Sequence, residues 1–252
     1  MTIPYDRAFY EEQFDGSLAS ARVLVGLLTT WMKPDSVLDI GCGRGAWLKA
    51  WREQGACKLV GVDGPWNDGA DMVEPAIEFR AADLERPLAG TVPFDLAMSI
   101  EVVEHLSPEA GVAVVDSLTG AAGVVMFSAA FSGQGGVHHV HERYHSYWGM
   151  LFRERGFSCF DAFRPRVWTD QRVAPWHRAN VFLFVRDGHA LANELSARGI
   201  TALADLGFMD AVHPWLYERW RSHEIGVRGH IRAIGPGLVR ALRRRLAPAR
   251  RG

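Results

Sequence analysis

The stretch VLDIGCGRG, residues 37–45, decides the fold of this chain. Its apolar first half predicts a short buried strand, and the run AWLKAWREQ that follows it predicts a helix. Between them stand Gly41, Gly43 and Gly45, which allow a tight turn and let a ligand approach the backbone. The first amides of a helix have no partner within the helix, so this loop is suited to bind a carboxylate or a phosphate.

Strands and helices alternate on the C-terminal side of this loop. The predicted strands are 36–41, 58–64, 76–84, one within 94–106, 123–130, 157–163 and 180–186. Helices are predicted at 45–56, from a Ser107-Pro108 start, and at 146–157. This alternation predicts a doubly wound, Rossmann-like α/β sheet, mostly parallel with an antiparallel last strand. In such sheets, ligands bind at the carboxyl ends of the strands, near the topological switch point.

Helical segments are predicted on both sides of the sheet domain. An apolar stripe in the first thirty residues predicts a helix, which Lys33-Pro34-Asp35 ends. After about Asp187 the helical periodicity continues without strands. We therefore expect an N-terminal helical segment (1–34), a ligand-binding domain (35–187) and a C-terminal helical extension with a basic tail (188–252).

Acidic residues stand at the ends of the first three predicted strands. Asp39 would repel a pyrophosphate but suits the ammonium group of an amino-acid-like ligand. Asp63 can accept hydrogen bonds from two ribose hydroxyls, and Asp83 can meet an adenine amine. Two alternatives are that these acids are ordinary turn residues and that the domain binds a nicotinamide dinucleotide. The dinucleotide motif needs a third glycine where Ala46 stands.

These motifs, in this order and spacing, resemble those of class I S-adenosylmethionine-dependent methyltransferases. The resemblance runs from about residue 37 to residue 185 and includes the FDLAMSIE run of the fourth strand, residues 94–101. It implies that S-adenosyl-L-methionine is the cofactor. The cofactor-binding residues that it implies are Asp39, Gly41, Cys42, Gly43, Gly45, Asp63, Gly64, Asp83, Leu84, Ile100 and Glu101.

The segment EVVEH, residues 101–105, carries two acids and a histidine. A helix that started near Glu101 would place Glu101, Glu104 and His105 on one face, where they can ligate a divalent cation. The segment resembles the E-V-x-E-H stretch of ubiquinone-biosynthesis O-methyltransferases, which implies Mg²⁺ on these three residues. In the alternative, no metal binds, and His105 packs beside the cofactor or acts as a base.

A histidine-rich loop, FSGQGGVHHVHERYH, follows the fifth predicted strand at residues 131–145. A glycine-bearing loop at a strand's carboxyl end suits a lid that contacts the acceptor, and histidine can accept a hydroxyl proton near neutral pH. The loop resembles G-Q-G-G-x-x-H-V-N-E-x-W-x-x-Y-W of a bacterial methyltransferase subgroup, with His141 in place of Asn and Tyr144 in place of Trp. The predicted catalytic residues are His105, His139, His141 and Glu142, with Glu142 orienting a histidine.

Two alternatives compete with this interpretation of the loop. In the first, most of these histidines are exposed loop residues, His138 and His145 in particular. In the second, His138, His139 and His141 form a zinc site, although neighbouring residues seldom converge on one ion without cysteines.

Charge and cysteine content limit the partners and the compartment. Residues 225–252 hold eight of the 28 Lys and Arg and no acid, which leaves 20 basic against 29 acidic residues in 1–224. An acidic body disfavours nucleic acid, and the favoured interpretation of the tail around 240–246 is a frayed, solvated run of charges. The alternatives are weak peripheral membrane contact and contact with the acidic body of another copy in a homodimer. Three scattered cysteines, a polar N-terminus and the lack of a long apolar run predict a cytoplasmic protein with no integral membrane segment.

The sequence therefore predicts a methyltransferase that acts on a small polar metabolite. Oxygen is the expected methyl acceptor, on a hydroxyl of a natural product or sugar, with histidine-assisted deprotonation. The alternatives are N- or C-methylation of a small molecule, another adenosyl or dinucleotide enzyme, and a protein of this fold that binds the cofactor without methylating.

Overall fold

The computed structural model describes residues 7–65, 67, 69–88 and 93–224. The chain divides into two compact units, residues 1–211 and 212–252. The first unit contains the sheet. In the second, the described residues form α8 (Pro214–Glu224). The predicted basic tail, around 240–246, lies outside the described residues.

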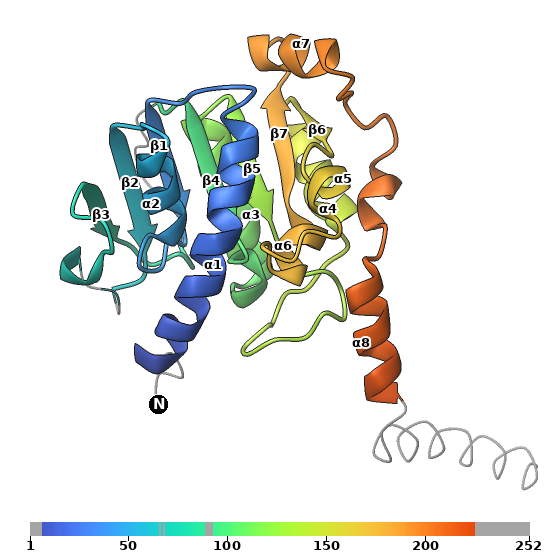
Figure 1. Cartoon of the computed structure of the whole chain (residues 1–252), viewed down its shortest axis with the longest axis horizontal. Helices are drawn as coiled ribbons and strands as arrows, with labels where there is room; N and C mark the ends of the chain where they lie inside the picture. The colour runs from blue at the N-terminus through green and yellow to red at the C-terminus, as the bar shows by residue number, and fades with distance from the viewer. Residues whose placement is uncertain (1–6, 66, 68, 89–92, 225–252) are drawn as a thin grey trace, which may run out of the picture. The chain divides into compact units, whose positions relative to one another are not determined.

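A seven-stranded sheet forms the centre of the first unit (Figure 1). Its strands are β1 (Ser36–Ile40), β2 (Lys58–Asp63), β3 (Ile77–Ala81), β4 (Leu96–Ile100), β5 (Val124–Ser128), β6 (Phe157–Phe160) and β7 (Phe182–Arg186). The strand order is β3-β2-β1-β4-β5-β7-β6, and β7 runs antiparallel to both of its neighbours while the first five strands are parallel. The predicted doubly wound sheet with an antiparallel last strand is confirmed.

Helices cover both faces of the sheet. They are α1 (Arg7–Leu28), α2 (Ala46–Glu53), α3 (Pro108–Ala121), α4 (His145–Glu154), α5 (Arg164–Val167), α6 (Pro175–Asn180) and α7 (Ala190–Ala197), with the 3-10 turns η1 (Gly69–Asp71), η2 (Val103–His105) and η3 (Leu206–Asp210). One buried cluster joins α1, α2 and α7 to the sheet, and a second joins α3, α4 and η3 to its other face. Because both faces are covered, β4 and β5 are buried along their whole length.

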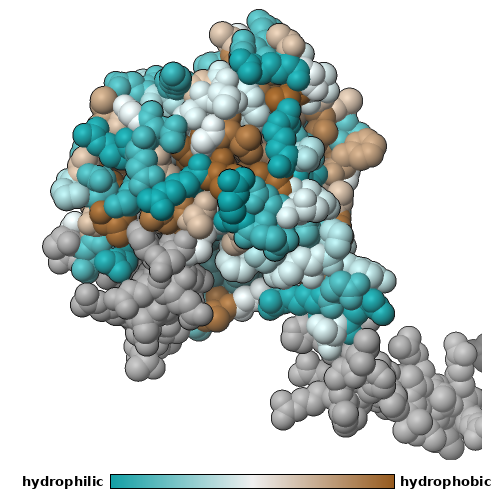
Figure 2. Space-filling view, in the orientation of Figure 1, coloured by the Kyte–Doolittle hydropathy of each residue, from teal (hydrophilic) through white to brown (hydrophobic). Residues whose placement is uncertain are grey.

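The N-terminal helix belongs to this same core. Leu24, Val25 and Leu28 of α1 are fully buried, and Arg22 makes an ion pair with Glu53 of α2 at 2.7 Å. On the face seen in Figure 2, hydrophilic side chains are interspersed with apolar ones, which is ordinary for a globular surface. Among the described residues, no helix is both long enough and apolar enough to cross a bilayer.

The sheet topology determines where a ligand can bind. The chain leaves β1 toward β2 on one side, while β4 lies on the other side, so the order of the strands reverses between β1 and β4. The carboxyl ends of parallel strands meet at one edge, and in doubly wound sheets ligands bind at this edge, beside the reversal. The glycine turn after β1 and the EVVEH segment after β4 both start at that edge.

Candidate active site

The glycine turn has a backbone that only glycine accepts easily. Gly41, Gly43 and Gly45 have φ values of 83°, 52° and 84°, in the left-handed region. A Cβ added at Gly41 would lie 2.3 Å from Cγ2 of Val102, which leaves no room for a side chain. At Gly43 such an atom would meet nothing within 4 Å, so the turn is open at its middle. This combination lets a ligand reach the backbone at Gly43.

Two buried carboxylates flank the turn. Asp63 accepts hydrogen bonds from the amides of Gly43 and Gly64, both at 2.6 Å, and so braces the turn. Asp39 is only 2% exposed, and its Oδ2 has no hydrogen-bond partner among the described residues. Burial, with the nearby charge of Asp63, raises the pKa of Asp39 well above its usual value. An unpaired buried carboxylate oxygen is costly, so this site is suited to a ligand that brings a donor or a positive charge.

The other predicted cofactor residues take more varied positions. The Cys42 sulfur packs toward Gly61, where an added Cβ would lie 2.7 Å from it, and Ile100 is buried at the end of β4. Leu84 is also buried. Asp83 follows β3 by two residues, is mostly exposed and accepts a hydrogen bond from the amide of Glu85 at 3.0 Å. Asp83 thus lies at the same edge of the sheet as the ends of β1 and β2, and its side chain caps the turn that follows β3.

The predicted helix starting near Glu101 is wrong. Glu101 has φ 55°, and its amide donates to the carbonyl and the hydroxyl of Ser128, at 3.2 and 3.0 Å. Pairing with β5 therefore continues past the end of β4 and prevents a helix from starting there. Only the short turn η2 forms, at Val103–His105. As a result, Glu101 does not share a helical face with Glu104 and His105.

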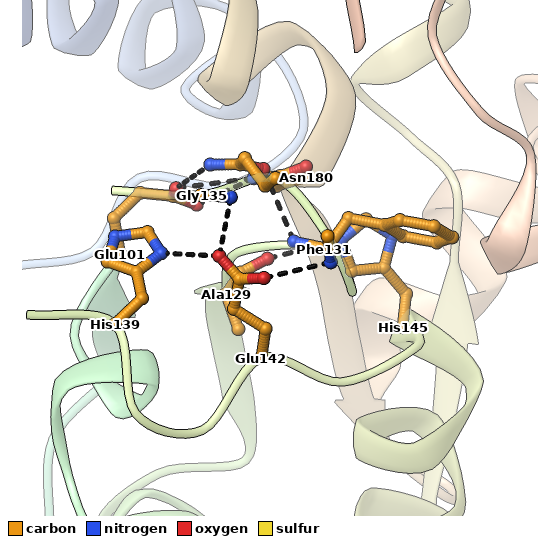
Figure 3. Close-up of polar contacts among 10 residues, drawn as sticks. Glu101, Ala129, Phe131, Gly135, His139, Glu142, His145 and Asn180 are labelled. Carbon is orange, nitrogen blue, oxygen red and sulfur yellow. Dashed lines mark hydrogen bonds and ion pairs between the residues drawn. The ribbon is translucent and has the colours of Figure 1, made fainter. Parts of the chain in front are cut away.

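Glu101 instead belongs to a buried polar network that the sequence did not reveal. Asn180, at the end of α6, donates to both carboxylate oxygens of Glu101 and to Oε1 of Gln134, at 3.0 to 3.2 Å (Figure 3). Gln134 also accepts a hydrogen bond from the amide of Phe131. Burial raises the pKa of Glu101, and the hydrogen bonds, that of Asn180 first, oppose the rise. Gln134 belongs to the loop motif that the sequence analysis identified, so it could have been recognised from the sequence. Asn180 belongs to no recognised motif.

His139 and Glu142 form a pair on the histidine loop. Nδ1 of His139 lies 2.7 Å from Oε1 of Glu142, and the Glu142 carboxylate also accepts from the amides of Gly133 and Gly135 (Figure 3). The ring of His105 meets that of His139 edge to face, with centroids 4.9 Å apart. Burial, with the neighbouring His139, lowers the pKa of His105 to about 4, so this imidazole is neutral at pH 7. The structure therefore brings His105, His139 and Glu142 together.

The remaining loop histidines lie elsewhere. The His141 ring is buried against Trp148, with centroids 5.3 Å apart, in the packing between α3 and α4. The alternative that leaves His145 exposed is wrong, because this residue begins α4 and its ring nitrogens contact the carbonyls of Met209 and Ala129. His138 is exposed. The three residues of the zinc alternative are thus not gathered, whereas Glu104, His105 and His139 are.

Comparison with known proteins agrees with this architecture. The profile of a family described as a methyltransferase domain matches residues 11–172, more than half of the chain. No curated protein matches the chain.

Three solved structures illustrate the likeness of the fold. DesVI of Streptomyces venezuelae superposes with a TM-score of 0.54 at 16% identity, over 73% of this chain and all of that one. The methyltransferase domain of a bacterial Hen1 gives 0.53 at 17% identity, over 68% and 98%. Magnesium protoporphyrin IX methyltransferase of Synechocystis PCC 6803 gives 0.52 at 16% identity, over 74% and 90%. At such identities the likeness concerns the fold.

Proposed function

Because the chain belongs to the methyltransferase-domain family of S-adenosylmethionine-dependent enzymes, we propose that it methylates a hydroxyl group of a small polar metabolite. One observation carries the proposal. The glycine turn contacts Val102, the residue after Glu101, at the same sheet edge as the histidine loop, and Oδ2 of the neighbouring Asp39 has no hydrogen-bond partner in the described part of the chain. The proposed methyl-donor site and the proposed proton acceptor would thereby lie at one edge of the sheet, at the switch point.

The residues around the turn fit the donor. The open backbone at Gly43 admits a nucleoside, Asp63 is the ribose-side acid, and Asp39 offers an unpaired oxygen to a cationic amino acid. When bound, S-adenosylmethionine supplies a methyl carbon that bonds to the acceptor oxygen while its C–S electron pair returns to sulfur, leaving S-adenosylhomocysteine and a methyl ether. Gly41, Cys42, Gly45, Gly64, Asp83, Leu84, Ile100 and Glu101 complete the proposed binding site.

His139 is the proposed general base. Its Nδ1 is engaged by Glu142, which leaves Nε2 to take the proton from the acceptor hydroxyl. Glu142 then stabilises the imidazolium, and its bonds from Gly133 and Gly135 keep it in place. His105 stays neutral beside this pair, so it can hydrogen-bond the acceptor without repelling a sulfonium. The burial of His141 supports a packing role for that residue rather than the predicted catalytic one.

The partners and compartment inferred from composition remain predictions. The acidic balance of residues 1–224 favours a small-molecule acceptor over a nucleic acid. Homodimer formation, weak membrane contact through the basic tail and a cytoplasmic location are also predictions. N- or C-methylation is the alternative for the acceptor atom.

Calorimetry of the full chain tests the donor site. We expect S-adenosylmethionine and S-adenosylhomocysteine to bind and NAD not to bind. Asp39→Asn should weaken binding at least about tenfold, since a buried carboxylate facing a cation contributes above 1.4 kcal/mol. Asp35→Asn makes the same change at an exposed position nearby and should bind like wild type. Equal affinity for NAD, or wild-type affinity in Asp39→Asn, would refute the site.

A labelled-methyl assay tests the acceptor. Turnover over a panel of hydroxylated metabolites, followed by NMR of the labelled methyl carbon, separates O-, N- and C-methyl products. We expect an O-methyl product, and we expect His139→Ala to lower kcat by about 10²–10⁴-fold while leaving cofactor affinity unchanged. An N- or C-methyl product would sink the assignment of oxygen, and full turnover in His139→Ala would remove the base.

A further inference from the structure

A pocket opens between α1 and the segment that contains α5. Its volume is about 370 Å³, within the range of small-molecule sites, and its lining includes Arg22, Arg166 and Arg172. None of its lining residues belongs to the glycine turn, the EVVEH segment or the histidine loop. We infer that this arginine pocket binds a small organic acid, whose oxyanion contacts the arginines while its apolar body lies on α1.

The arginines of the pocket come from three different parts of the chain. Arg22 belongs to α1, Arg166 belongs to α5, and Arg172 lies on the loop that follows α5. They gather positive charge on a body that is acidic as a whole, since residues 1–224 hold 20 basic against 29 acidic residues. Guanidinium groups bind carboxylates and phosphates through paired N–H donors, so this pocket favours an anionic ligand.

Two of these guanidinium groups are held in place by partners of their own. Arg22 donates to both carboxylate oxygens of Glu53 on α2, at 2.7 and 2.8 Å. Arg166 donates to the carbonyl of Ala162 at 3.0 Å and lies over the ring of Trp31, 5.4 Å from its centroid. A guanidinium has five N–H donors, so these contacts engage only part of each group. Side chains that are already positioned lose less conformational entropy when a ligand binds.

The carboxylate of Asp170 also lines the pocket, and arginines offset its charge. Arg172 donates to it from its guanidinium at 2.6 Å and from its backbone amide at 3.0 Å. These bonds from Arg172, and more weakly the charge of Arg178, lower the pKa of Asp170 to about 2. Arg178 is only 7% exposed, and its Nε has no hydrogen-bond partner in the described part of the chain. Two arginines thus act on one acid, which leaves an excess of positive charge here.

An apolar stripe of α1 forms the floor of the pocket. Val23 and Leu27 are half-buried and pack against the core, and Gly26 lies on the same helix face. A Cβ added at Gly26 would meet no described atom within 4 Å. At about 1.5 Å per residue, the stripe from Val23 to Leu27 is about 6 Å long. The open space at Gly26 therefore has room for an apolar body of about the size of one ring.

The two walls of the pocket are fixed to each other. The amide of Ala174, two residues after Arg172, donates to the hydroxyl of Ser20 on α1 at 2.9 Å. Trp31, just after α1, meets the ring of Phe163, just before α5, with centroids 5.8 Å apart. The pocket is therefore formed before a ligand enters it, which is usual for small-molecule sites.

This inference goes beyond the proposed function. It concerns a second site, whose lining residues are not those proposed for the donor or the base. Binding to the arginine pocket is measured without turnover, so either proposal can fail alone.

Calorimetry of the full chain with phenylacetate, phenyl phosphate and the neutral phenylacetamide tests the ligand class. The two acids carry the same ring, so comparing their affinities separates a carboxylate ligand from a phosphate ligand. We expect one equivalent of at least one acid to bind, at least about tenfold more tightly than phenylacetamide or inorganic phosphate. Failure of both acids to bind, or equal affinity for the amide or for inorganic phosphate, would overturn the inference.

Arg22→Gln tests the contribution of the arginines. This change should weaken binding of the acid at least about tenfold, because it removes a charged donor from the pocket. Arg198→Gln is the matched control: Arg198 makes an equally exposed ion pair with Glu194 on α7, at 2.6 Å, and does not line the pocket. It should bind the acid like wild type. Equal losses in the two variants would contradict a local role for Arg22.

Gly26→Leu tests the apolar floor without changing any charge. The new side chain would fill the open space, so binding should weaken at least about tenfold, while Tm should not fall because leucine favours a helix more than glycine does. Gly16→Leu makes the same change in the same helix, also in open space, and should keep wild-type affinity. Wild-type affinity in both Gly26→Leu and Arg22→Gln would overturn the inference. S-adenosylmethionine binding by the same samples then still decides the proposed function.

Discussion

The side-chain amide of Asn180 donates to both carboxylate oxygens of Glu101, at 3.1 and 3.2 Å, although 79 positions separate the two residues. The bond joins the end of α6 to the end of β4. It also engages Gln134, and so connects the start of the histidine loop to the sheet. The loop's position therefore depends on a residue far from it in sequence.

Asn180→Asp should weaken this connection. The change replaces a donor with a second carboxylate beside Glu101, and we expect the free energy of unfolding at pH 7 to fall by about 2–3 kcal/mol. Both carboxyl groups would have raised pKa values when folded, so the folded state would bind protons more readily and the loss should shrink as pH falls toward 5. Urea unfolding at both pH values measures it. Asn193→Asp, on the exposed side of α7, is the control, and equal losses in the two variants would contradict the prediction.

Gly136→Ala should displace His139 without unfolding the protein. The added Cβ would stand 2.2 Å from Nε2 of that ring, so the imidazole must move, whereas the backbone of Gly136 accepts alanine. We expect kcat to fall about 10²-fold, the effect of a misplaced catalytic group, with cofactor affinity retained. Gly120→Ala, in α3 with nothing within 4 Å, should keep wild-type turnover. Unchanged kcat in Gly136→Ala would show that His139 is dispensable.

Gly43→Ala should reduce cofactor affinity more than it reduces stability. The substitution costs about 1–2 kcal/mol of backbone strain at φ 52°, and its methyl group would enter the open space beside the turn, where we propose that the cofactor binds. Gly156→Ala carries similar strain at φ 75°, also in open space, but follows α4 on the loop to β6. Calorimetry should show a loss of affinity of at least about tenfold in Gly43→Ala alone. Parallel behaviour of the two variants would mean that the turn matters only for folding.

His177 should make the protein sensitive to mild acid. Burial lowers the pKa of His177 to about 3, so in the folded state the ring stays neutral, while the unfolded chain binds a proton below about pH 6.5. Stability from this group is present above pH 6.5 and is lost as pH falls toward 3, by about 2 kcal/mol between pH 7 and pH 5. His177→Phe retains a ring against Trp47 and should remove that part of the pH dependence. Denaturant unfolding of the wild type and of His177→Phe at pH 7 and pH 5 measures this difference. The same pH dependence in both proteins would contradict the prediction.

Local patterns predicted those parts of the fold that local chemistry governs. The apolar run of β1, the alternate glycines after it and the Ser107 cap each act within a few residues, and the structure forms all three, with Ser107 accepting from the amide of Ala110. The prediction of a helix at Glu101 was wrong because the amide of Glu101 pairs with Ser128, a residue of another strand. A backbone that continues a sheet cannot be distinguished from a helix start by the spacing of two acids and a histidine.

The site was only partly predictable for the same reason. His139 and His141 are alike in their local sequence, and what separates them is the Glu104 carbonyl, which binds the amides of Val140 and His141 and leaves His141 against Trp148. Asn180 was not recognised because nothing near it in the sequence indicates Glu101. Tertiary contacts determine the positions of His141 and Asn180, and a short sequence motif carries no information about such contacts.

The reversed direction of β7 has a consequence for how such enzymes diversify. Because β7 is antiparallel to the other strands, the residues just before it lie at the edge where the other strands end. This is why Asn180, at the end of α6, lies at that edge. The segment between β6 and β7 can therefore change in length and sequence to suit new acceptors, while the proposed nucleoside site beside β1 and β2 stays unchanged. One half can then be held constant by selection while the other is free to change.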